Sequence, residues 1–159
     1  MRSLPSALLL ALILTSCTIT SPRRTPPWAE TELFHHPQLV VDNDVPLASL
    51  TLWGVKLGDP ESKIPAGRIR EHARQGWIWC DNGVRYRTEQ GIIVTLGMWD
   101  PTLLASFNIH SADDVIARFG PTNTIDLAEP VHVYRYRNGK LAVIWNDREK
   151  QLNAINISQ

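Results

Sequence analysis

The sequence has no excess of charge of either sign. Its 16 Lys and Arg residues balance 16 Asp and Glu residues, and no basic stripe runs along any segment. Proteins that hold nucleic acid through its phosphate backbone need such an excess, so we expect no nucleic-acid partner. Cysteine is also scarce. With Cys17 and Cys80 alone, the chain can form at most one intramolecular disulfide.

Catalytic, metal and cofactor motifs are missing as well. The chain has no glycine-rich phosphate loop, no metal-ligand pair and no triad order. Three histidines are scattered along it: His72, His110 and His132. His35 and His36, followed by Asp42 and Asp44, match no ligand spacing typical of a metal site. We therefore expect no catalytic residue, no metal and no cofactor.

The apolar run at residues 7–14 is too short to span a bilayer, but it suits the hydrophobic region of a signal peptide. It ends in Leu14, Thr15, Ser16 and Cys17, which resembles the lipobox of bacterial lipoproteins. The resemblance implies a signal peptide at 1–16 and a lipid on Cys17. It implies a lipid-anchored location in the cell envelope, at the outer membrane facing the periplasm if there are two membranes.

An ordinary secretory signal with an incidental cysteine is the alternative to the lipobox. In that case Cys17 could pair with Cys80 and close a long loop. If Cys17 carries a lipid instead, Cys80 has no intramolecular partner, and we expect it to be a buried thiol at the end of a strand.

Residues 17–48 are interpreted as a lipid-anchored tether, because prolines recur and no hydrophobic period is sustained. Trp28, Leu33 and Phe34 are apolar enough for part of this segment to lie against the domain instead. The remaining residues, 49–159, are enough for one domain with a hydrophobic core.

The clearest structural pattern lies at 111–157. Ser111 can cap a short helix, and Gly120 ends it. Three strand-like runs follow, at residues 131–137, 140–145 and 152–157. Asn138 and Gly139 lie between the first two runs and predict a type I′ hairpin turn.

A similar order of features occurs earlier in the chain. Asp59 and Pro60 can start a short helix that Pro65 cuts off. Residues 66–75 are interpreted as a further helical turn or a loop. Strand-like runs follow at residues 77–80, 84–88 and 92–98. We interpret the two patterns as an internal duplication with units at about 50–100 and 103–159; a chance match of two meanders is the alternative.

Two helix–meander units predict an α+β fold. We expect an antiparallel sheet of about six strands with short helices on one face. In residues 113–121, 134–136 and 141–145 the domain resembles small bacterial lipoproteins such as the outer-membrane assembly lipoproteins of the SmpA/OmlA type. The duplicated unit resembles the β-lactamase-inhibitor protein. These resemblances imply a fold more than a function.

Alternation along two strands suggests a partner-binding face. Tyr134 and Tyr136 alternate with Arg135 and Arg137, and an earlier strand has a similar alternation. Tyr and Arg are typical of interfaces. The candidate partner-binding residues are Arg85, Arg87, Tyr134, Arg135, Tyr136 and Arg137. The alternative is that the aromatic side chains belong to the core and the arginines are merely solvated.

Taken together, these patterns favour a lipid-anchored envelope module that binds or scaffolds another envelope protein. An inhibitor or immunity-like lipoprotein that blocks an enzyme is the first alternative, and an envelope hydrolase is the second. An exposed face of arginine and aromatic residues would favour binding, whereas a deep pocket with convergent carboxylates or histidines would favour an enzyme.

Overall fold

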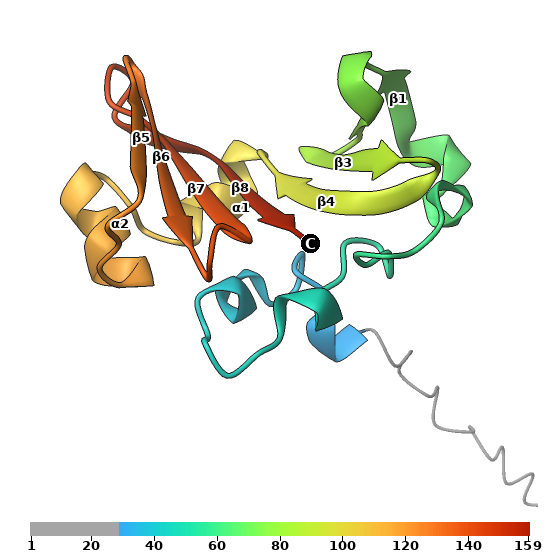
Figure 1. Cartoon of the computed structure of the whole chain (residues 1–159), viewed down its shortest axis with the longest axis horizontal. Helices are drawn as coiled ribbons and strands as arrows, with labels where there is room; N and C mark the ends of the chain where they lie inside the picture. Colours follow the sequence, from blue (N-terminus) through green and yellow to red (C-terminus); the bar gives the residue numbers. More distant parts are fainter. Residues whose placement is uncertain (1–28) are drawn as a thin grey trace, which may run out of the picture.

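The computed structural model describes residues 29–159, and these form one antiparallel sheet with a few short helices (Figure 1). The sheet order is β1-β2-β3-β4-β8-β7-β6-β5. The strands are β1 Ile69–His72, β2 Trp77–Cys80, β3 Val84–Glu89, β4 Ile92–Met98, β5 Ile125–Ala128, β6 Val131–Tyr136, β7 Leu141–Asn146 and β8 Gln151–Ser158.

The sheet consists of two four-stranded meanders, β1–β4 and β5–β8, that meet through their last strands. β4 pairs with β8 through Leu96↔Ile157 and Met98↔Ile155. Figure 1 shows the first meander in green and yellow and the second in orange and red, on either side of this seam. Beyond Met98 and Ile155 the β4–β8 ladder ends.

The sheet has eight strands rather than the expected six because each meander carries an additional edge strand. β1 lies within the segment predicted to be helical or irregular, and it pairs with β2. All four residues of β5 are exposed. Neither edge strand alternates between buried and exposed positions, so neither has the hydrophobic period of a half-buried strand.

The helix predicted after Ser111 is confirmed as α2, Ala112–Phe119. The Ser111 hydroxyl accepts a hydrogen bond from the Asp114 amide at 3.1 Å, and Gly120 ends the helix with a φ of 92°. A second helix, α1, comprises Pro101–Ala105.

The first predicted helix is wrong. Its residues form the 3-10 turn Glu61–Lys63, since Pro60 and Pro65 bracket too few residues for an α-helix. The carboxylate of Asp59 does not cap a helix. It accepts from the Lys56 amide at 3.0 Å and forms an ion pair with Lys63. The 3-10 turns are Ala29–Thr31, Pro37–Val40, Leu47–Ser49, Glu61–Lys63, Ala66–Arg68 and Arg74–Gly76.

The predicted tether differs most from the structure. From Ala29 onward it packs against the domain, and Leu33 and Val40 are completely buried in the core. Glu32 is buried too, and its carboxylate accepts hydrogen bonds from the amides of Trp53 and Gly54 at 3.0 and 2.9 Å. Residues 29–48 therefore belong to the domain, while the earlier part of the predicted tether lies outside the described residues.

The hairpin turn between β6 and β7 is present where it was predicted, but it is longer, because Tyr136 pairs with Leu141 and leaves residues 137–140 in the turn. The Gly139 amide donates to the Tyr136 carbonyl at 3.0 Å. Arg137, Asn138 and Gly139 all have positive φ, at 50°, 58° and 83°. Asn138 and Gly139 thus adopt the expected left-handed conformation, and Arg137 shares it.

Candidate functional site

The two faces of the first meander differ in chemistry. On β2, Ile78 and Cys80 point into the core, so Trp77 and Trp79 lie on the opposite, open face. Trp79 pairs with Arg85 of β3, and Trp77 pairs with Arg87. The open face therefore carries neighbouring rows of tryptophan and arginine.

Arg85 lies at the centre of this arrangement. Its guanidinium carbon is 4.8 Å from the Trp77 ring centroid and 5.4 Å from that of Trp79. Its Nη2 donates a hydrogen bond to Oδ1 of Asn156 on β8, at 3.0 Å. These contacts hold the side chain across the seam between the two meanders.

Gly97 of β4 makes room for the Arg85 side chain. Gly97 pairs with both Arg85 and Asn156. A Cβ atom added at Gly97 would lie 2.6 Å from Cγ of Arg85 and 2.8 Å from Oδ1 of Asn156. Any larger residue would therefore displace the arginine from its position over the strand.

The charge of Arg85 is not compensated within the described part of the chain. Asn156, its hydrogen-bond partner, is neutral, and no carboxylate between residues 29 and 159 forms an ion pair with it. Its Nε is buried without a hydrogen-bond partner. Burial lowers the pKa of the guanidinium from its ordinary value, but arginine remains charged at neutral pH.

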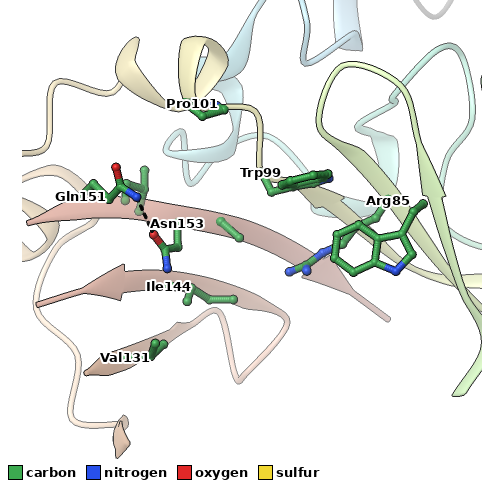
Figure 2. A pocket seen from close by; sticks show the side chains of 10 residues that line it. Arg85, Trp99, Pro101, Val131, Ile144, Gln151 and Asn153 are labelled. Carbon is green, nitrogen blue, oxygen red and sulfur yellow. Dashed lines mark hydrogen bonds between the residues drawn. The ribbon is translucent and has the colours of Figure 1, made fainter. Parts of the chain in front are cut away.

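A groove of about 430 Å³ opens next to Arg85, beyond the point where the β4–β8 ladder ends. Trp79 and Trp99 form one wall, with ring centroids 5.1 Å apart in an edge-to-face arrangement. Figure 2 shows Trp99 and Arg85 facing Ile144 and Asn153 of the second meander. The lining residues are Trp79, Arg85, Trp99, Pro101, Val131, Ile144, Gln151, Leu152, Asn153 and Ala154.

The groove combines apolar walls with a single charged residue. Trp99 keeps 40% of its surface exposed, which is high for so large an apolar side chain. Arg85 is the one charged residue in the lining, and Gln151 and Asn153 add side-chain amides. Among the described residues that line the groove, none is a carboxylate or a histidine.

Two of the six candidate partner-binding residues belong to the core. Tyr134 is 4% exposed and Tyr136 is 9% exposed. Phe119 of α2 stacks on Tyr136 with ring centroids 5.6 Å apart. The alternative interpretation of the tyrosines was correct, because the apolar stripe of α2 covers that face of β6.

Three of the four candidate arginines have other contacts. Arg87 forms an ion pair with Glu89 at 2.6 Å, and Arg135 forms one with Asp126 at 2.7 Å. Arg137 donates to the backbone carbonyls of Val45, at 2.7 Å, and of Asp42. Arg137 thus fastens the N-terminal segment to the hairpin, and Arg85 is the candidate that lines the groove.

Trp79, Trp99, Gly97 and Asn156 were not among the predicted site residues. Alternation along β2 places both of its tryptophans on one face, and this signal was available in the sequence. The roles of Gly97 and Asn156 depend on the β4–β8 pairing, which no local pattern reveals.

No group of three or more His, Cys, Asp and Glu residues among residues 29–159 could hold a metal ion. No helix in the same range is long and apolar enough to cross a membrane. Cys17, the predicted lipid-attachment residue, lies outside the described residues.

Comparison with known proteins adds little. No protein family matches the chain, and no curated protein sequence is significantly similar to it. Among solved structures, a DUF4309 family protein, YjgB from Bacillus subtilis, has a TM-score of 0.45 and 10% sequence identity, over 58% of this chain and 71% of that one. A likeness this distant supports no conclusion about function.

Proposed function

We propose that this protein is a lipid-anchored module of the cell envelope that binds another envelope protein through the groove at the seam of its two meanders. The anchor is the lipid on Cys17, and the location is the outer membrane facing the periplasm if there are two membranes. The observation that carries the proposal is the position of Arg85, which has no counter-charge within residues 29–159 and lies against two tryptophans beside an apolar groove.

This arrangement is costly for the isolated domain. Removing an arginine from water without a counter-charge opposes folding, and Trp99 leaves a large apolar surface exposed to solvent. The apolar cost at Trp99 falls when a partner covers the groove, and the cost at Arg85 falls when that partner supplies a counter-charge. Trp and Arg are also the residues most often found among the energetic hot spots of interfaces.

Site-specific photocrosslinking in the native host tests the binding function. Benzoylphenylalanine replaces Ile144 in the groove and, as a control, Leu127 on the exposed edge strand β5. We expect one dominant crosslinked protein from position 144 and not from position 127. Equal products from both positions, or none from position 144, would contradict the proposal.

The anchor is tested separately. Cys17→Ala should remove incorporation of radiolabelled fatty acid and release the protein from the membrane fraction. Cys80→Ala serves as the matched control, because Cys80 is buried in the domain and should not affect labelling. Labelling that persists in Cys17→Ala would show that the lipobox interpretation is wrong.

A further inference from the structure

We infer that the groove binds a segment of the partner in which an acidic side chain stands beside an aliphatic or aromatic side chain, with the carboxylate on Arg85 and the apolar neighbour against Trp99 and Ile144. This inference rests on the proposed function and names the chemistry that the groove recognises.

The charge argument comes from comparing arginines on the same face of the sheet. Arg87 and Arg135 each pair with a carboxylate of this chain, Glu89 and Asp126 respectively. Arg85 has five N–H donors and one hydrogen bond, to a neutral amide. Of these three arginines, Arg85 is therefore the one that lacks a counter-charge within residues 29–159, and a ligand can supply it.

The position of the guanidinium supports binding of a carboxylate. Trp77 and Trp79 lie within 5.4 Å of it, Asn156 holds one end, and Gly97 lets it lie close to the strand. Because the side chain is already immobilised, it loses little conformational freedom when it binds. Its planar fork can bind a carboxylate with two parallel hydrogen bonds.

The apolar argument comes from the walls of the groove. Trp99 and Pro101 lie along one side of it, and Val131 and Ile144 along the other (Figure 2). A volume of about 430 Å³ is within the range of pockets that enclose small ligands. A groove of this size accommodates a few adjacent side chains of a peptide segment rather than the surface of a whole domain.

The groove also has groups that can recognise a peptide backbone. The Gln151 Nε2 donates to the Glu149 carboxylate at 2.7 Å and, over a longer distance of 3.4 Å, to Oδ1 of Asn153 (Figure 2). This leaves Oε1 of Gln151 to accept from a backbone N–H and Nδ2 of Asn153 to donate to a carbonyl. A polypeptide segment can contact the charged Arg85, the apolar walls and these side-chain amides at the same time.

NMR titration with two matched peptides tests this inference. The probes are acetyl-Ile-Leu-Glu-Phe-Val-amide and the same peptide with Gln in place of Glu. Both are titrated into the ¹⁵N-labelled protein while the indole N–H of Trp79 and Trp99 and the Nε–H of Arg85 are observed. We expect saturable shifts at these groups and roughly tenfold tighter binding of the Glu peptide, since a hydrogen bond to a charged group contributes that much.

Two arginine variants provide the controls. Arg85→Gln should bind both peptides equally weakly, whereas Arg87→Gln, on the same strand and outside the groove, should retain the preference for Glu. Arg85→Lys keeps the charge without the fork, so its preference for Glu should be intermediate. An unchanged amide spectrum away from the groove shows that each variant is folded.

The inference is overturned if the two peptides bind wild-type protein equally, if neither binds, or if the shifts lie away from the groove. These results are distinct from failure of the proposed function. A partner crosslinked at position 144, together with peptides that fail to bind, would retain the binding function and reject acidic recognition. Peptide binding in the groove without a crosslinked partner would retain acidic recognition and reject the proposed binding of an envelope protein.

Discussion

Arg85 and Gly97 show how much of the groove depends on single side chains. An alanine at Gly97 would place a methyl group against Cγ of Arg85, near the base of the side chain, where little adjustment is possible. The arginine would have to leave both Asn156 and the tryptophans. Gly97 therefore serves the site through close packing, and a backbone requirement for positive φ is not involved.

Cys80 provides a prediction about pH. Burial, with a smaller contribution from the nearby Asp81 carboxylate, raises the pKa of its thiol to about 11. The unfolded thiol ionises near 8.5. The free energy of unfolding should therefore fall as pH rises from about 8.5 toward 11, because the unfolded state loses its proton first.

Urea denaturation at pH 8 and pH 10 measures this effect. Cys80→Ala is the control, since it retains every tyrosine and lysine and should lose less stability between the two pH values than the wild type. In native protein at pH 8, iodoacetamide should modify Cys80 far more slowly than in denatured protein. Rapid labelling of the native protein would show that the thiol is accessible.

Some features of single residues could be predicted from the sequence, and others could not. Ser111 was recognisable as a cap because it bonds an amide three residues away, and Cys80 was recognisable as a buried strand residue from its neighbours. The Arg85–Asn156 hydrogen bond joins residues 71 positions apart. Only the tertiary pairing of β4 with β8 brings them together, so sequence patterns could not predict it.

Among the elements, the half-buried strands were predictable and the edge strands were not. β2, β3, β4, β6, β7 and β8 were all predicted within a few residues of their observed bounds. β1 and β5 were not predicted, because exposure on both faces removes the alternation that identifies a strand. The 3-10 turn at Glu61–Lys63 was mistaken for a helix because capping residues alone do not supply length.

The β6–β7 hairpin gives a prediction at this scale. Gly139 has a φ of 83°, and a Cβ atom there would meet nothing within 4 Å. Gly139→Val should therefore destabilise the protein through backbone strain alone, by about 1–3 kcal/mol. Gly139→Asn should cost much less, because asparagine tolerates positive φ. Thermal melts of both variants measure the difference, and equal melting temperatures would be inconsistent with this turn.

At the scale of the whole molecule, the N-terminal segment is part of the core. Prolines and a missing period made residues 29–48 look like a tether, yet Leu33, Val40 and Leu47 fill the space over the sheet. Specific polar contacts hold the segment in place, including Glu32 to the 53–54 turn and Arg137 to Val45. Irregular backbone secured by such long-range contacts carries no periodic signal in the sequence.

Leu33 tests whether this segment contributes to the stability of the whole domain. Leu33 is completely buried, so Leu33→Ala should lower the free energy of unfolding by about 2–5 kcal/mol. Leu39, in the same segment and only partly buried, is the matched control and should lose less when changed to alanine. Urea denaturation measures both. A Leu33→Ala protein as stable as the wild type would mean that the segment is an appendage of the domain.

The central position of β8 has a consequence for how the chain is made. β8 is the last strand in chain order, yet it lies between β4 and β7 and joins the two meanders. While the chain is being synthesised from its N-terminal end, β4 and β7 each have an edge that stays open until β8 emerges. Such edges pair readily with other chains, so we expect the nascent protein to be most prone to aggregation before β8 is available. A premature stop before residue 151 would leave two unjoined halves rather than a slightly shorter domain.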